Sequence, residues 1–383
     1  MKIVVAPNAF KGSMTARHAA ESMAAGIRMA WPDVQIELVP VADGGDGLVA
    51  VALDALQGKR YRLLVTGPRF ELVESEFCHV PELSFAAIEM ALASGLALLP
   101  EDMRDPVLTT TLGTGELILA ALDLGVRKIG VGIGGSATCD GGIGMATALG
   151  ALFLDAAGRP VSPVGGALQD IVHIDLSGLD PRIGDTVIEA VCDVENPLLG
   201  EQGAARVYGP QKGAGREQVE QLEIGLTHLA RVIQADLGLD VRNLPGAGAA
   251  GGLGAGLHAF LGAALRPGVD VVLDLVGLDE KLEGAALVLT GEGQIDFQTV
   301  FGKAPAGVAQ RAKKQKIPCI VVAGSVGADL GTLHQQGVDA VFSLCPGPMS
   351  LKEAMAQAET SISRTTEQVI RCFLAGQRRS IIS

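Results

Sequence analysis

The sequence contains a glycine-rich stretch, residues 132–144, in which nearly half of the residues are glycine. It follows an apolar run, Lys128–Val131, and precedes a pattern typical of a helix, Met145–Leu152. A strand, a glycine-rich turn and a helix in this order let backbone N–H groups converge on an anion, with help from the helix dipole. Because glycine has no Cβ, a ligand can approach this backbone closely. The stretch therefore favours phosphate or carboxylate binding over a tight connection without a ligand, but it does not name the ligand.

Part of this turn also fits the dinucleotide-binding fingerprint. Gly132, Gly134 and Ala137 have the required spacing, and Asp155 follows where a ribose-binding acid is expected. Two features oppose this interpretation: the adjacent glycines that follow are poor helix starters, and Asp140 would place a carboxylate near a pyrophosphate with no cation between them. The turn suits a metal-complexed phosphate better. A nicotinamide-dependent oxidoreductase acting on a small hydroxyacid stays as an alternative.

Both ends of the chain alternate short apolar runs with helical patterns, as is typical of a parallel sheet. Near the start, the runs Ile3–Ala6 and Ile36–Val41 each precede a helix. From Ala286 onward, strands 286–289, 318–323 and 340–344 alternate with helices 305–314, 330–336 and 351–374. Between them, residues 60–66, 72–80 and 85–90 read as consecutive strands joined only by turns, which predicts a mixed sheet.

We therefore predict an α/β fold with two domains, for which a chain of 383 residues is long enough. The first is a Rossmann-like parallel-sheet domain formed by both chain ends, residues 1–60 and 285–383. The second, residues 61–284, is an inserted α/β domain with a mixed sheet and the glycine-rich turns. Besides residues 132–144, these include residues 245–256, which precede a predicted helix, His258–Leu265, and repeat the pattern of Gly141–Gly144 at Gly251–Gly254.

The composition excludes several classes of protein. A formal charge of −13 argues against nucleic-acid binding, which needs a basic surface. The six cysteines are scattered singly, without a zinc-binding spacing, as is typical of free thiols in a reducing compartment. No apolar run is long enough to span a membrane and the N-terminus lacks a signal sequence, so we expect a cytoplasmic protein without a membrane partner. The sequence leaves open whether the chain forms a homo-oligomer.

Carboxylates recur just past the ends of predicted strands. They are Asp43 and Asp46, Asp193, and Glu292 with Asp296. This edge of an open α/β sheet is where ligands bind, and Mg²⁺ takes one or two carboxylates while keeping water and phosphate as its other ligands. A turn or a helix cap would explain a single acid, but the recurrence at three strand ends favours a functional site.

Lys11, Lys212 and Lys303 each stand beside a glycine. Each can place an ammonium group on a phosphate. Because Lys303 is followed by Ala304 and lacks the upstream glycine, the chain has no P-loop motif. The six histidines form no pattern with serine or cysteine, so we do not predict a catalytic nucleophile.

Several unusual strings, in one order along nearly the whole chain, resemble those of the bacterial glycerate kinase family. They are Ala6–Ser13, Val41–Gly47, Thr109–Glu116, residues 132–144, Cys192–Leu198, Tyr208–Ala214, Pro245–Gly252 and Thr290–Lys303. The resemblance implies two α/β domains, one Rossmann-like, and phosphorylation of D-glycerate by ATP with Mg²⁺ in organic acid catabolism. It favours 2-phosphoglycerate as the product, with 3-phosphoglycerate as the alternative. Asn8, Cys139 and Gln294 differ from the family's usual Asp, Asn and Arg.

The resemblance also implies roles for the residues singled out above. Asp193 is the predicted base for the hydroxyl proton, Asp43 is the alternative base, and Lys11 neutralises charge. The predicted nucleotide and phosphate contacts are Gly134, Gly135, Ser136, Thr138 and Lys303. Lys212 and Asp46 are predicted to contact the substrate, and Glu292, Asp296 and Asp140 to bind the metal. A non-catalytic metabolite-binding protein stays as the other alternative.

Overall fold

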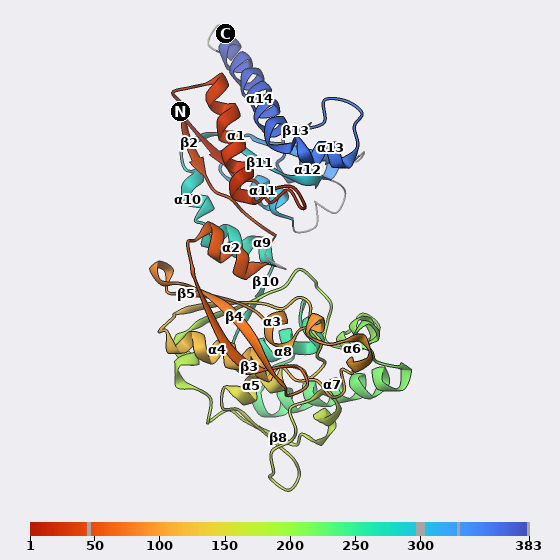
Figure 1. Ribbon diagram of the computed structural model, residues 1–383. Helices are drawn as coiled ribbons and strands as arrows, with labels where there is room; N and C mark the ends of the chain where they lie inside the picture. The colour runs from red at the N-terminus through yellow and green to blue at the C-terminus, as the bar shows by residue number, and fades with distance from the viewer. Residues whose placement is uncertain (44–46, 296–302, 328–329, 381–383) are drawn as a thin grey trace. The chain divides into compact units, whose positions relative to one another are not determined.

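The computed structural model describes residues 1–43, 47–295, 303–327 and 330–380, which divide into two compact units (Figure 1). Met1–Asp43 and Val269–Ser383 make up one of them, the terminal unit. Gly44–Gly268 make up the other, the central unit. Both chain ends thus belong to one unit, and the boundaries lie at residues 43/44 and 268/269, compared with 60/61 and 284/285 in the sequence-based prediction.

The terminal unit has a five-stranded parallel sheet. Its order is β13 (Ala340–Ser343), β12 (Cys319–Val326), β11 (Ala285–Ile295), β1 (Lys2–Val5) and β2 (Gln35–Leu38). The helices α1 (Ala16–Ala30) and α14 (Ala358–Ser380) pack side by side, as do α11 (Ala304–Lys314) and α12 (Gly331–Gln336) (Figure 1). The strand order reverses between β1 and β11. In doubly wound sheets such a switch point is where ligands bind, beyond the carboxyl ends of the strands.

Three details of the terminal unit differ from the sequence-based prediction. The helix expected over residues 351–374 is two helices, α13 (Leu351–Ala356) and α14, because residue 357 interrupts it. Ser350 and Glu353 start α13 with a capping box. Strand β11 extends to Ile295 instead of ending at residue 289, because its second half still pairs with β12. Glu292 therefore lies within a strand and not in the loop after it.

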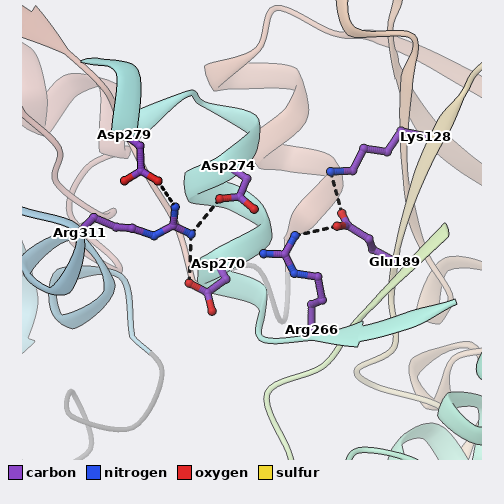
Figure 2. Close-up of polar contacts among 7 residues, drawn as sticks. All are labelled: Lys128, Glu189, Arg266, Asp270, Asp274, Asp279 and Arg311. Carbon is purple, nitrogen blue, oxygen red and sulfur yellow. Dashed lines mark hydrogen bonds and ion pairs between the residues drawn. The ribbon is translucent and has the colours of Figure 1, made fainter. Parts of the chain in front are cut away.

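The boundary near residue 268 has a clear electrostatic reason. Helices α9 (Gly268–Leu275) and α10 (Leu278–Leu282) carry three aspartates that surround Arg311 of α11 (Figure 2). Its guanidinium donates to Asp274 at 2.8 Å and to Asp270 at 3.3 Å, and it also pairs with Asp279. These contacts attach α9 and α10 to the terminal unit, which moves the boundary toward the N-terminus by more than a dozen residues.

The boundary near residue 43 reflects the packing of α2 (Leu48–Ala55) on β4 and β5 of the central unit. The backbone N–H of Val49, in the first turn of α2, donates to Glu89 Oε1 at 2.8 Å. A carboxylate at this end of a helix satisfies a backbone donor and interacts favourably with the helix dipole. The helix therefore belongs to the central unit, although the alternating pattern of the sequence suggested otherwise.

The central unit has a six-stranded sheet that is mixed, as predicted. Its order is β10 (Ala264–Arg266), β9 (Val187–Val191), β6 (Lys128–Gly132), β5 (Phe85–Glu89), β4 (Leu72–Val80) and β3 (Lys59–Thr66). The first four strands are parallel, and β4 is antiparallel to both β5 and β3. Across three of the parallel strands, the largely buried Glu189 carboxylate pairs with Lys128 Nζ at 2.9 Å and with the Arg266 guanidinium at 2.7 Å (Figure 2).

The helices of the central unit enclose an aliphatic core against this sheet. They are α3 (Ala91–Ser94), α4 (Leu112–Asp123), α5 (Ile143–Ala148), α6 (Ala204–Tyr208), α7 (Arg216–Leu237) and α8 (Ala249–Leu261). Two predicted helices were misplaced. Helix α5 stops at Ala148, and the following β7 (Leu152–Leu154) pairs with β8 (His173–Asp175); α8 starts earlier than expected and β10 takes the end of the predicted helix. In the described part of the chain, no helix has the length and apolarity needed to cross a membrane.

Candidate functional site

A cavity of about 760 Å³ opens in the terminal unit at the switch point between β1 and β11. Residues that follow β1 and β2, together with the ends of β11 and β12, line part of it. The cavity carries the polar groups Lys11, Asp43, Glu292, Gln294, Lys303 and Ser325. Four of these were predicted as site residues, so the strand ends bring them to one place.

Asp43 connects two elements at this cavity. Its Oδ1 accepts hydrogen bonds from Asn8 Nδ2 at 3.0 Å and from the backbone N–H of Ala304, the first residue of α11, at 2.8 Å. Asn8 in turn accepts from the backbone N–H of Ala9 at 2.7 Å. The carboxylate is therefore fixed at the N-terminus of a helix, where its charge is favourable. Asn8 holds the residue that the sequence suggested as the alternative base.

A second carboxylate and an ammonium group face the same cavity. Glu292 has a side chain that is only 8% exposed, and its Oε1 lies 3.9 Å from Lys303 Nζ. Lys303 occupies the N-cap position of α11, and the exposed Lys11 comes from the turn after β1. The cavity thus carries both charges needed to hold a metal-complexed anion. Two other predicted acids, Asp46 and Asp296, lie outside the described residues.

In the central unit, the glycine-rich turn exposes a short run of backbone. Gly135 is exposed and Gly134 half-buried, whereas residues 136–142 are buried. The flanking N–H groups of Ile133 and Ala137 donate to the carbonyls of Val191 and Ser94. Within the part of the chain that the structure describes, the N–H groups of residues 134–136 have no acceptor. Gly135 adopts a left-handed φ of 68°, a conformation that occurs in anion-binding turns, so we call residues 134–136 the candidate anion-binding concavity.

Lys212 lies directly behind this concavity. Its side chain is 1% exposed, and Nζ donates to Ser136 Oγ and to the backbone carbonyl of Thr138, both at 2.7 Å. Burial lowers the pKa of Lys212, and the nearby Cys139 and Asp140 oppose the shift. Lys212 was predicted to contact the substrate; in the structure its two hydrogen bonds hold the turn in place. Among the described residues, Thr138 Oγ1 is buried without a hydrogen-bond partner.

Asp140 is fully buried and accepts four hydrogen bonds. Its Oδ2 accepts from the N–H and hydroxyl of Thr111, at 2.8 and 2.7 Å, and from the N–H of Gly144 at 3.3 Å. Its Oδ1 accepts from the N–H of Gly142 at 3.1 Å. Burial raises the pKa of Asp140, whereas these hydrogen bonds lower it. Asp140 was predicted as a metal ligand; the structure uses it to join the turn to the start of α4.

The second glycine-rich turn packs against the first. The N–H of Gly141 donates to the carbonyl of Gly251 at 3.1 Å, and a Cβ on Gly251 would overlap the carbonyl oxygen of Thr138. A Cβ on Gly256 would overlap the carbonyl of Gly141. The similarity between the two turns therefore reflects close backbone packing. Only Gly134 and Gly135 are exposed enough to face a ligand, and the sequence pattern alone did not separate them from the packing glycines.

The structure removes the geometric basis of the dinucleotide fingerprint. Helix α5 begins only at Ile143, after the adjacent glycines. Asp155 follows β7, a strand of the small separate sheet, and its Oδ2 accepts from the Arg159 guanidinium at 2.9 and 3.0 Å. It therefore does not follow a strand next to β6, where a ribose-binding acid would be required.

Asp193 shares one sheet edge with the glycine-rich turn. It follows β9 after one intervening residue, Cys192, and the carbonyl of Val191, the last residue of that strand, accepts the hydrogen bond from Ile133 at 3.1 Å. Asp193 is exposed, and its Oδ1 accepts from the N–H of Gly268 at 3.0 Å. The central unit thus brings together the predicted base and the anion-binding concavity.

We expect Lys212→Met to lower the free energy of unfolding by about 1–3 kcal/mol, because Ser136 Oγ and the Thr138 carbonyl lose their buried donor. The loss should grow with pH. Burial lowers the pKa of Lys212 in the folded chain below its ordinary value of 10.5 in the unfolded chain. At a pH between these two pKa values the unfolded chain binds more protons than the folded chain, so the wild type becomes more stable as the pH rises. The variant has no lysine at this position and does not gain this stability. Urea unfolding of both proteins at pH 7 and pH 9.5 measures this; a difference that shrinks at the higher pH would contradict it.

The chain matches known proteins over its whole length. A sequence model described as the glycerate kinase family matches residues 3–374. A glycerate kinase of Halalkalibacterium halodurans is 49% identical, with 96% of this chain and 97% of that protein covered. A glycerate 2-kinase of Escherichia coli is 47% identical, with 99% and 100% covered. A crystal structure from Salmonella typhimurium LT2, described as a glycerate kinase 2, superposes with a TM-score of 0.88 at 46% identity, covering 99% of both chains.

Proposed function

Because the chain belongs to the glycerate kinase family, we propose that this kinase transfers the terminal phosphoryl group of ATP to D-glycerate with Mg²⁺, in organic acid catabolism. We favour 2-phosphoglycerate as the product over 3-phosphoglycerate, since one relative with 47% identity is named a glycerate 2-kinase. The structural observation that carries the proposal is the concavity of three unpaired N–H groups at residues 134–136, within the described part of the chain, above the buried Lys212.

Phosphoryl transfer depends mainly on positioning and on neutralising the charge of the moving group. The N–H groups of Gly134, Gly135 and Ser136 can bind phosphate oxygens without any rearrangement of the backbone. Lys212 does not need to touch the phosphate to help, because a buried charge acts at longer range than an exposed one. Lys11 and Lys303 supply positive charge in the cavity of the terminal unit.

Asp193 is our proposed base for the proton of the glycerate hydroxyl group. It is exposed at the strand end beside the concavity, and the hydrogen bond from Gly268 orients its carboxylate. Asp43 is the alternative, since it lines the cavity and is also held by two hydrogen bonds. A positioned base of this kind contributes about 10²–10⁴-fold to the rate.

The cavity fits a magnesium ion that is bound together with phosphate. Glu292 offers a nearly buried carboxylate, and Asp43 lines the same space. Among the described residues, no group of three or more potential metal ligands is present, and Mg²⁺ does not require one because it retains water and phosphate oxygens. We propose Glu292 as a ligand, with Asp296, which lies outside the described residues, as the second. When bound, the ion would neutralise phosphate charge.

We expect ADP release to require both glycerate and a divalent metal ion. The acceptor hydroxyl is a reactant, and the metal offsets charge that the two lysines alone leave uncompensated. A coupled ADP assay with glycerate omitted, or with EDTA added, measures both dependences. Full-rate ATP hydrolysis without glycerate would contradict the kinase proposal. The product can be read by phosphorus NMR, because one carbon-bound proton splits the signal of the 2-phosphate and two protons split that of the 3-phosphate.

A further inference from the structure

The cavity of the terminal unit has further lining residues that the discussion so far does not explain. Besides the charged groups, apolar side chains line it, and we call them its apolar wall. The side chains of this wall come from the turn after β1, the segment after β13, α13 and the start of α14: Phe10, Leu344, Met349, Leu351, Ala354, Met355 and Ala358. One cavity therefore combines an apolar surface with two ammonium groups and two carboxylates.

Helix α13 is unusual because none of its residues is buried. Leu351 at its first position is 77% exposed, and Met355 one turn later is half-exposed. The helix is nevertheless held in place by its capping box and by the hydrogen bond from Ser13 Oγ to the carbonyl of Met355 at 3.1 Å. Because this fixed helix presents leucine and methionine to an open cavity, an occupant of the cavity would remove their apolar surface from water.

The dimensions and charges of the cavity select the occupant. Its volume of about 760 Å³ lies in the range of roughly 300–1,000 Å³ that is typical of sites for drug-sized ligands, and glycerate, with three carbons, is far smaller. The occupant therefore needs an apolar body and an anionic end, the latter for Lys11 and Lys303. The cavity lies at the switch point of a doubly wound sheet, and folds of this kind bind nucleotides at that point.

We propose that the apolar wall of this cavity binds the purine base and ribose of ATP, with α13 covering the base and the phosphates directed toward Lys11 and Lys303. This rests on the proposed function for the identity of the phosphoryl donor. The flexible thioethers of Met349 and Met355 suit a flat aromatic ring, since methionine makes favourable contacts with aromatic groups. The base then supplies the contact that α13 otherwise lacks.

The chain offers a matched pair of variants for the test. Ala354 and Ala356 lie on the same short helix, but only Ala354 lines the cavity. In Ala354→Trp the indole fills the space of the base, so we expect the KM for ATP and the Kd for ADP to rise at least about tenfold. Ala356→Trp adds the same bulk outside the cavity and should behave like the wild type. Calorimetry with ADP and with inorganic tripolyphosphate, and the KM for glycerate, complete the comparison.

Weaker ADP binding by Ala354→Trp, with tripolyphosphate binding and the KM for glycerate within about threefold of the wild type, supports the proposal. Unchanged ADP binding in this variant overturns it, and so does a rise in the KM for glycerate alone, which would assign the cavity to the acceptor. If Ala354→Trp does not fold, Leu351→Ala replaces it and should weaken ADP binding severalfold. Because calorimetry with ADP needs no turnover, the cavity assignment is decided even if glycerate-dependent ADP release is absent and the proposed function fails.

Discussion

Replacing Asp193 with asparagine should lower kcat by at least about a hundredfold and leave the KM for ATP within a few-fold. Asparagine keeps the shape of the side chain and an oxygen that can accept the hydrogen bond from Gly268, so the strand end should stay in place. What it loses is the negative charge and the basicity that proton removal requires. A hundredfold loss corresponds to about 2.7 kcal/mol of transition-state stabilisation.

Steady-state kinetics of ADP release, with thermal unfolding as a check on folding, measure this effect. Asp102→Asn is the matched control, because it removes an exposed carboxylate elsewhere in the central unit. If Asp193→Asn stays within tenfold of the wild type and Asp43→Asn is strongly impaired, the base is Asp43. If both variants keep their activity, neither carboxylate removes the proton, and the proposed mechanism is wrong even though the reaction stands.

The parts of the fold that the sequence predicted well are those with a strong local pattern. Apolar runs such as Ile3–Ala6 mark strands covered on both faces, and three consecutive strand patterns between residues 60 and 90 indicated the mixed sheet. Where the pattern was short or shared between two structures, the prediction failed. Residues 152–154 continue an apolar helix-like run, yet they form a strand because β8 is there to pair with them.

The boundaries of the two units could not be read locally because they depend on partners distant in sequence. Nothing near Asp270 or Asp274 signals that Arg311 will bind them. Likewise, α2 follows the alternating pattern of the N-terminal segment, but Glu89, which accepts from its first turn, comes from the central unit. Ion pairs and caps of this kind appear only once the chain is folded.

At the candidate site, too, the sequence indicates residue types but does not show how each residue is used. The glycine-rich turn indicated an anion site, and the N–H groups of residues 134–136, which have no acceptor in the described part of the chain, are consistent with that use. Its composition did not reveal that the buried Lys212 supports the turn, or that the Asp140 carboxylate accepts four hydrogen bonds from the protein. A sequence motif does not show which of its residues are buried. Helix α13 was missed as a cavity wall because it was merged with α14 in the predicted pattern.

The packing of the two glycine-rich turns leads to the second large effect, a loss of stability in Gly251→Ala. Gly251 has a φ of 67°, and its added Cβ would overlap the carbonyl oxygen of Thr138, which also accepts the hydrogen bond from Lys212. Left-handed strain costs an alanine about 1–2 kcal/mol, and overpacking a tight site adds about 1–3 kcal/mol. We therefore expect the free energy of unfolding to fall by roughly 2–5 kcal/mol, a large part of the about 5–15 kcal/mol typical of proteins.

Gly262→Ala separates the two causes of this loss. Gly262 has nearly the same φ, 68°, but open space where the Cβ would lie. In Gly262→Ala the free energy of unfolding should therefore fall only by the cost of backbone strain, about 1–2 kcal/mol. Urea unfolding gives both values, and kinetics on the folded fraction of Gly251→Ala should show a raised KM, because displacing Thr138 disturbs the support of residues 134–136. Equal losses of stability in the two variants would mean that the two glycine-rich turns can move apart at little cost. In that case the close contact between them would not be what holds the anion-binding concavity in place.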